Sequence, residues 1–328
     1  MSGYCFVKSI VCMKWGRNVK IFAPDYYKNF KCTNSKCRHN CCIGWEIDID
    51  DDSYEYYKSA EGSFGKRLRE NIAYDDCPHF ILGKDERCPF LNSDNLCDII
   101  CTMGEDALCQ ICSDHPRYRN FYSGIEEIGV GLSCEAAVRL IVGKKDKMVI
   151  EEISDDGQDD GQSLEEIEFF RVRDEIFSII QNRAERIDTR LSKVLKLCGA
   201  EGITISEKRY ADLFSGLEYM EKDWHDILKD IQKEDFLAKL PEEFDIATEQ
   251  LVVYFLFRHL AKVLDGETLS SVVSFCVLST KMIMYLCEYL LWKNGKLSLE
   301  DVAEIARMYS CEVEYSEENT QTLLDYFK

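Results

Sequence analysis

The chain has 328 residues, of which 46% are hydrophobic and 12% aromatic, so it can fold around a sizeable core and is not a disordered chain. Sixty acidic residues against 40 basic ones give a net charge of −20, which repels phosphate backbones and argues against nucleic-acid binding. The charge is uneven, with 20 basic and 22 acidic residues in 1–150 but 20 and 38 in 151–328. The acidic second half fits either a solubilising surface or a cationic partner.

Residues 1–20 contain neither the apolar run nor the small-residue cleavage site of a secretory signal, and we interpret them as an N-terminal extension. The longest apolar stretch, residues 272–292, is interrupted by Lys281 and Glu288 and therefore predicts a buried helix, not a membrane span. We expect a cytoplasmic protein with no membrane partner. An odd count of 17 cysteines favours metal binding or catalysis over a disulfide framework.

A first region, residues 21–150, is interrupted by loops rich in proline and asparagine. Between these loops, apolar spacing predicts a helix over residues 52–71 and another over 134–142 that ends near Gly143. We expect this region to form a cysteine-cluster metal-binding domain made of loops and short helices.

Residues 151–163 are acidic with two glycines and predict a linker. Ser163 then precedes a predicted helix over residues 164–197, with Glu166 completing a capping box and Gly199 ending the helix.

The rest of the chain, to residue 328, is predicted to be helical. Helices are predicted over residues 249–264, 268–292 and 299–308, and a last one follows Ser316. Long alternating strands are absent. The predicted fold is mostly α, with the cysteine-rich region followed by an all-α domain over residues 164–328.

Eleven of the 17 cysteines fall between residues 32 and 134. Thiolates are ligands of zinc and iron–sulfur clusters and are also nucleophiles, so this crowding predicts a metal site. The first group is Cys32, Cys37, Cys41 and Cys42, and the second is Cys88, Cys97, Cys109, Cys112 and Cys134 with Cys77 and Cys101 nearby. Only Cys109 and Cys112 have the CxxC spacing of a zinc ribbon, so zinc and iron–sulfur both stay open. Because adjacent side chains diverge, either one of Cys41 and Cys42 is a ligand and the other is not, or both serve chemistry.

The stretch from Ile21 to Cys32, together with a series of motifs that follow it in the sequence, resembles the flagellin lysine-N-methylase family. These motifs are Cys37, Cys41-Cys42, Gly44-Trp45, Ile47-Asp48-Ile49-Asp50, Cys88-Pro89-Phe90-Leu91-Asn92, Leu96-Cys97, Gly104-Glu105, Leu108-Cys109, Cys112, Pro116-Arg117 and Leu132-Ser133-Cys134-Glu135-Ala136. The resemblance covers residues 21–142. His115 departs from it, since an aromatic residue is more usual there, and Cys5, Cys12, Cys77 and Cys101 are additional.

The resemblance implies a cytoplasmic enzyme that methylates lysine ε-amines of flagellin, with S-adenosylmethionine as methyl donor and a [4Fe–4S] cluster. It also implies that the twin cysteine, Cys41-Cys42, relays the methyl group. The cysteines it leaves for the cluster are Cys32, Cys37, Cys88, Cys97, Cys112 and Cys134. The preferred ligands are Cys88, Cys97, Cys112 and Cys134, and Cys109 can replace one of them.

A relay has a chemical rationale, because lysine has a pKa near 10.4 and is protonated at neutral pH, whereas a thiolate is an available nucleophile. Glu46, Asp48 and Asp50 are candidate acceptors of the lysine proton, with loop or helix-cap roles as the alternative.

Among other candidates, His39 and His79 are either ligands or loop residues, and Trp45 either stacks on a sulfonium or belongs to the core. Arg117 and Arg119 either bind a carboxylate of the donor or pair with local acids.

The sequence contains neither a Rossmann glycine fingerprint nor the Cys-x3-Cys-x2-Cys spacing of radical chemistry, so the donor-binding residues stay unassigned. A non-catalytic zinc- or iron-chelating module and a redox protein are the competing functions.

Overall fold

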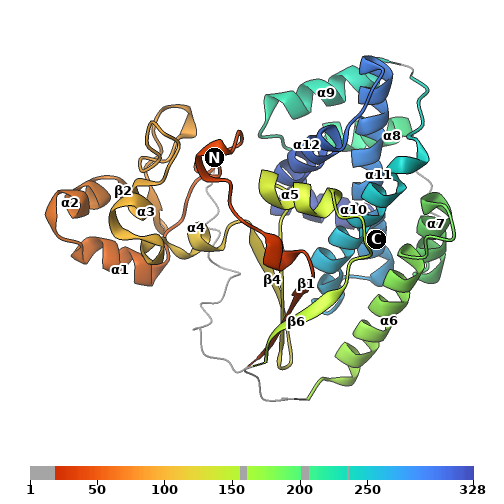
Figure 1. Cartoon of the computed structure of the whole chain (residues 1–328), viewed down its shortest axis with the longest axis horizontal. Coiled ribbons are helices and arrows are strands. Elements are labelled where there is room, and N and C mark those ends of the chain that lie inside the picture. The colour runs from red at the N-terminus through yellow and green to blue at the C-terminus, as the bar shows by residue number, and fades with distance from the viewer. Residues whose placement is uncertain (1–18, 156–160, 201–206, 235) are drawn as a thin grey trace. The chain divides into compact units, whose positions relative to one another are not determined.

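The computed structural model describes residues 19–155, 161–200, 207–234 and 236–328. Within these ranges the chain forms two compact units, one of residues 32–117 and one of residues 19–31 with 118–328 (Figure 1). The units divide the chain at other points than the expected boundaries near residues 20, 150 and 163, because strands and a helix from the first half pack into the helical core. The expected extension over residues 1–20 lies almost wholly outside the described residues.

The first unit is built from short elements around a small core. Its helices are α1 (Asp51–Ser59), α2 (Gly62–Glu70), α3 (Asp98–Met103) and α4 (Gln110–Asp114), with 3-10 turns at Asn34–Lys36, Lys84–Glu86 and Glu105–Ala107, and an antiparallel pair of strands, β2 (Ile72–Tyr74) and β3 (Pro78–Phe80). The helix expected over residues 52–71 is interrupted, because Ala60 is extended and Gly62 has a φ of +75°.

The second unit contains a four-stranded mixed sheet that the sequence did not predict. Its strands are β1 (Lys20–Pro24), β4 (Arg117–Tyr122), β5 (Ile125–Val130) and β6 (Ile150–Asp155), in the order β4-β5-β1-β6. Strand β1 runs parallel to β5 and antiparallel to β6. The predicted fold, mostly α without long alternating strands, is therefore confirmed for the helical second half of the chain but missed this sheet. Strand β6 includes the start of the expected linker. The acidic composition of these residues had indicated a linker and not a strand.

The second half of the chain is helical, as expected. Helix α5 (Glu135–Val142) is followed by α6 (Leu164–Ile180), α7 (Ile187–Leu197), α8 (Glu207–Ser215), α9 (Lys222–Lys233), α10 (Asp245–His259), α11 (Leu269–Asn294), α12 (Leu299–Tyr309), a π-helical turn (Ser310–Glu314) and α13 (Glu317–Asp325). A turn at residues 181–186 divides the single helix expected over 164–197. The predicted capping box of Ser163 with Glu166 is confirmed, and Ser298 forms a second one with Asp301 at the start of α12.

Helices α10 and α11 form the centre of this core and are buried on nearly all sides (Figure 1). Helix α11 is long and apolar enough to cross a membrane, but 78% of its most apolar window is buried inside the structure. The predicted buried helix over residues 272–292 is thus confirmed. It ends at Gly295, whose φ of +71° is the left-handed conformation that glycine adopts at helix C-termini.

Candidate active site in the cysteine-rich unit

The paired cysteines of the first unit lie on a short turn held by hydrogen bonds. The amide of Cys42 donates to the side-chain oxygen of Asn40 (2.9 Å), and Nε1 of Trp45 donates to the carbonyl of Cys41 (2.7 Å). The carbonyl of Cys42 accepts from the amide of Cys88 (2.8 Å), which joins the turn to a second cysteine-bearing segment. The backbone of both paired cysteines is therefore fixed.

The two thiols of this pair differ in acidity. A hydrogen bond from the Cys42 thiol to the Cys41 sulfur lowers the pKa of Cys41 to about 7, although partial burial opposes the shift. The same hydrogen bond, burial and the neighbouring sulfurs of Cys41, Cys88 and Cys97 raise the pKa of Cys42. At neutral pH the exposed Cys41 thus carries a substantial thiolate fraction, while Cys42 remains a hydrogen-bond donor.

Four more cysteines lie in or against the same core as Cys42: Cys88, Cys97, Cys109 and Cys112. Burial raises the pKa of Cys88 to about 11 and also raises that of Cys97. A hydrogen bond with Cys109, together with burial, raises the pKa of Cys112, to which Cys42 and Cys88 also contribute. These sulfurs are therefore close enough to repel one another when deprotonated. A bound cation would relieve that repulsion.

The predicted metal ligands are brought together only in part. Within the described ranges, no group of three or more His, Cys, Asp or Glu side chains is arranged to hold one metal ion. Cys32 is exposed and accepts from the amide of Asn34 (3.3 Å), and the thiol of Cys37 donates to the carbonyl of His39 (3.2 Å). Cys134 belongs to the second unit, where it is the N-cap residue of α5.

The candidate ligands are all thiols. No disulfide joins the cysteines in the part of the chain that the structure describes, so their sulfurs are chemically available. An all-thiolate set suits both iron–sulfur and zinc.

Among the candidate proton acceptors, Asp50 is a helix cap. One of its carboxylate oxygens accepts from the amide of Ser53 (3.0 Å) at the start of α1, and the other accepts from the amide of Gln110 (2.7 Å) at the start of α4. Glu46 is exposed and lies 4.0 Å from Nδ1 of His79. Asp48 pairs with His79 in an isolated antiparallel bridge.

The other candidate residues take mainly structural positions. Trp45 is half-buried against the core of the first unit, and its ring lies 6.1 Å from that of His115. His39 is exposed, whereas Nδ1 of His79 lies 3.1 Å from the carbonyl of Cys77. Arg119, in the second unit, pairs with Glu126 (2.8 Å), which is the alternative expected from the sequence.

Sequence reasoning missed a polar clamp around the Cys88–Cys97 loop. Arg67 donates to Asp98 (2.7 Å) and to the carbonyl of Pro89 (2.6 Å), and the amide of Asn92 donates to Asp98 (2.9 Å). These bonds fix the segment between two of the candidate ligands. Residues 92–95 have the composition of a turn, so the sequence predicts a loop there. It does not predict that Arg67 of α2 binds this loop, because Arg67 is more than twenty residues away in the sequence.

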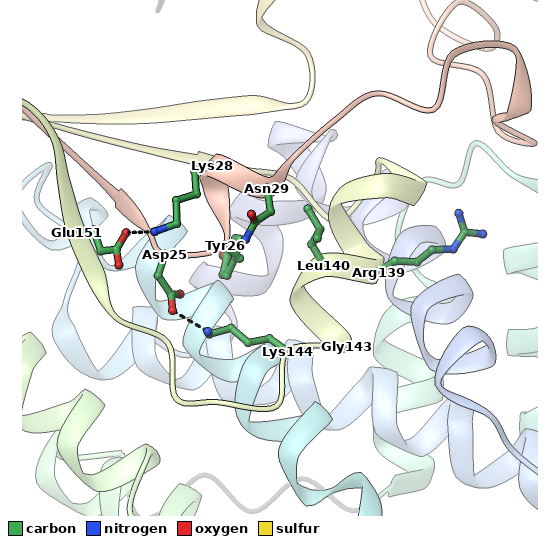
Figure 2. A pocket seen from close by; sticks show the side chains of 9 residues that line it. All are labelled: Asp25, Tyr26, Lys28, Asn29, Arg139, Leu140, Gly143, Lys144 and Glu151. Carbon is green, nitrogen blue, oxygen red and sulfur yellow. Dashed lines mark hydrogen bonds and ion pairs between the residues drawn. The ribbon is translucent and has the colours of Figure 1, made fainter.

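A polar pocket of about 420 Å³ lies in the second unit, between β1, the end of α5 and the start of β6 (Figure 2). Lys28 pairs there with Glu151 (2.9 Å), and Lys144 pairs with Asp25 (2.7 Å). Each of the two lysines is thus paired with an acid of the same pocket. The two ion pairs fasten the segment after β1 to the rest of the unit.

Comparison with known proteins finds similarity to lysine methylases. Residues 200–328 match the family model of the FliB lysine N-methylase C-terminal domain. The chain is 27% identical over 150 residues to the lysine-N-methylases of Salmonella choleraesuis and Salmonella typhimurium, which is 42% of this chain and 36% of each relative. It is 26% identical over 143 residues to the flagellar biosynthetic protein FliU of Salmonella muenchen, which is 42% of this chain and 85% of that protein.

The match thus spans about a third of the length of the two curated lysine-N-methylases. No solved structure matches the chain. The resemblance first noted in residues 21–142 and the domain match over residues 200–328 lie in different parts of the sequence and agree with each other. The chain is thus similar to the FliB lysine N-methylase C-terminal domain over residues 200–328 and to curated lysine-N-methylases over part of its length.

Proposed function

We propose that this protein transfers methyl groups from S-adenosylmethionine to lysine ε-amines of flagellin in the cytoplasm, with Cys41 as the relaying nucleophile. The observation that supports the relay is the hydrogen bond from Cys42, which lowers the pKa of Cys41 to about 7 beside a cluster of further thiols. The similarity to FliU, a flagellar biosynthetic protein, supports flagellin as the substrate.

The first displacement forms a bond between the Cys41 sulfur and the methyl carbon as the bond from that carbon to the sulfonium sulfur breaks. S-Adenosylhomocysteine leaves as a neutral thioether, so the negative charge of the thiolate and the positive charge of the sulfonium cancel. A thiolate is suited to this step, because it is more nucleophilic than a protonated lysine.

The second displacement is the harder one, since the leaving group is a thiolate. The unprotonated lysine nitrogen forms the new bond to the methyl carbon, the bond to the Cys41 sulfur breaks, and a base receives the proton from nitrogen. The Cys42 thiol, already donating to the Cys41 sulfur, stabilises the departing thiolate by the same hydrogen bond that lowers its pKa. Glu46 and Asp48 are the remaining candidates for the base, because both oxygens of Asp50 accept backbone amides.

A metal group would be held by Cys88, Cys97, Cys112 and Cys109, which lie in or against the same core as Cys42. Cys134, the other preferred ligand, lies in the second unit. When bound, an iron–sulfur cluster or zinc would supply positive charge that stabilises neighbouring thiolates. The residues of the chain itself fix the turn that carries Cys41.

The test is transfer of labelled methyl from S-adenosylmethionine to flagellin by anaerobically purified protein, with bound iron and zinc measured in the same samples. Cys41→Ser is expected to reduce transfer to background while bound metal is retained. Cys101→Ser removes an exposed thiol from α3 in the same unit and is the matched control, expected to transfer normally.

Full transfer by Cys41→Ser would contradict the relay and favour direct attack of lysine on the donor. Loss of metal in Cys41→Ser would instead make Cys41 a ligand. A wild-type protein that binds metal but transfers no label would support the non-catalytic chelating module.

A further inference from the structure

The turn that joins α8 to α9 displays two adjacent apolar side chains to solvent. Tyr219 and Met220 lie in this turn, residues 216–221, and are 52% and 54% exposed. Aromatic residues and methionine are enriched in protein interfaces relative to the rest of the surface. Single exposed apolar residues are common on protein surfaces, so the meaning of this pair depends on how firmly the turn is held.

Buried polar groups hold the backbone of this turn. The carboxylate of Glu312, which is 1% exposed, accepts from the amides of Met220 (2.7 Å) and Glu221 (2.6 Å). The side chain of Asn319, also buried, accepts from the amide of Glu218 (3.1 Å) and donates to the carbonyl of the same residue (2.9 Å). Burying a carboxylate costs free energy unless hydrogen bonds compensate for the lost water, and the amides of the turn provide such bonds here.

Two side-chain contacts complete this support. The buried guanidinium of Arg307 on α12 binds both carboxylate oxygens of Glu221 (2.9 and 3.0 Å), a bidentate geometry that fixes orientation as well as distance. The ring of Tyr219 stacks on the ring of His225, with 4.1 Å between the ring centroids and 5° between the planes. The backbone of the exposed pair and the ring of Tyr219 are therefore ordered before anything binds, which lowers the entropy cost of association.

The surroundings of this apolar pair are acidic. Residues 216–230 contain five acidic and two basic side chains, and Glu218 and Asp223, which precede and follow the pair in the sequence, are both exposed. Lys222, the basic residue nearest the pair in the sequence, is already paired with Asp226. An apolar centre with an acidic margin is complementary to a partner surface that carries lysines next to apolar residues.

We infer that residues 216–221 form a docking surface for a lysine-bearing segment of the protein substrate, with Tyr219 and Met220 as its apolar anchors. This rests on the proposed function, which supplies a protein substrate with reactive lysines. The acidic margin favours this partner over a second copy of the chain, because two copies would bring like charges together. The two anchors are assigned to substrate binding and not to the transfer of the methyl group.

The test measures binding of flagellin to the full-length protein by biolayer interferometry without S-adenosylmethionine, so that it does not depend on methyl transfer. Tyr219→Ala and Met220→Ala are each expected to weaken binding by about tenfold or more, as truncation of an anchor residue in an interface commonly does. Tyr326→Ala is the matched control, because Tyr326 is an exposed tyrosine (47%) of the same unit, and it should bind flagellin as the wild type does.

A pair of charge reversals tests the acidic margin. Asp223→Lys and Asp188→Lys each reverse one exposed acid in the first turn of a helix, α9 and α7 respectively. Only Asp223→Lys should weaken binding of flagellin, and the difference between the two variants should shrink at high salt, because salt screens exposed charges.

Wild-type affinity in both Tyr219→Ala and Met220→Ala would overturn the inference, and so would a wild-type protein that does not bind flagellin. Self-association that these two variants lose in analytical ultracentrifugation, with flagellin binding unchanged, would assign the surface to a second copy and would also overturn it. A wild-type protein that binds flagellin through this surface but transfers no methyl group would refute the proposed function alone.

Discussion

At the scale of single residues, the asymmetry between Cys41 and Cys42 arises from the turn that carries them. Adjacent side chains usually diverge, but here the backbone is tied through Asn40, Trp45 and Cys88, and the two sulfurs share a hydrogen bond. The family resemblance in the sequence includes the twin cysteine, and it therefore predicts a catalytic role for this pair. Which thiol is the more acidic was not predictable, because it depends on the direction of one hydrogen bond.

This hydrogen bond predicts a pH dependence. Below pH 7 Cys41 is mainly protonated and unreactive, and above pH 7 it is mainly thiolate, so its alkylation rate should rise with a midpoint near pH 7. In Cys42→Ala the donor is lost, and the midpoint should move up toward about 8.5, the value of an unperturbed thiol. The measurement is the rate of iodoacetamide labelling of Cys41 against pH in metal-free protein.

Cys42→Ser is the conservative control, since a hydroxyl still donates a hydrogen bond and should keep the midpoint below that of Cys42→Ala. Labelling of the exposed Cys101 in the same samples corrects for the reagent's own response to pH. An identical midpoint in wild type and Cys42→Ala would show that Cys42 does not set the acidity of Cys41.

At the scale of elements, helix ends were predicted well and strands were not. Ser163 and Ser298 carry capping boxes that are local in sequence, and Gly295 ends α11 in the left-handed conformation, so adjacent residues suffice to place them. Strand β1 pairs with β5 and β6, more than a hundred residues away, so its partners leave no local signal. Whether residues 150–155 form a strand or a linker depends on their hydrogen bonds to β1, which the local sequence does not indicate.

Asp50 connects two elements, and this predicts a stability effect. Its two oxygens cap α1 and α4 through Ser53 and Gln110, so Asp50→Ala should destabilise the first unit by about 1 to 2 kcal/mol, the usual cost of losing an N-cap. Asp52→Ala, an exposed position on α1, is the control and should cost clearly less. The measurement is the free energy of unfolding from denaturant titration.

Asp50→Asn keeps one acceptor oxygen and should recover part of the lost stability. If Asp50→Asn is fully stable but loses methyl transfer, Asp50 is the acceptor of the lysine proton after all, and its capping bonds are incidental. Equal stability of Asp50→Ala and Asp52→Ala would contradict the capping role itself.

At the scale of the whole molecule, the two units differ in how much apolar surface supports them. Among the described residues, the core of the first unit has 11 buried members, two of which are cysteines, whereas the core of the second unit has 52. The sequence predicted the cysteine-rich region and the helical region, because composition changes between them. It did not predict that residues 19–31 and 118–150 join the helical unit, because this depends on strand pairing and on the packing of α5.

Small cores commonly depend on a metal or another cross-link, so the first unit should depend on its proposed metal group far more than the second. Removing metal from anaerobically purified protein with a chelator should therefore speed amide hydrogen exchange within residues 32–117. The amide of Cys88, which donates to Cys42, and that of Phe80, which donates to Ile47 (3.1 Å), are informative probes. Amides of α10 and α11 should keep their protection, because they lie in the large apolar core of the second unit, which contains none of the ligands proposed for the first unit. Equal exchange with and without metal would show that the thiols of the first unit are not a structural metal site. Faster exchange throughout both units would show that the two units do not unfold independently.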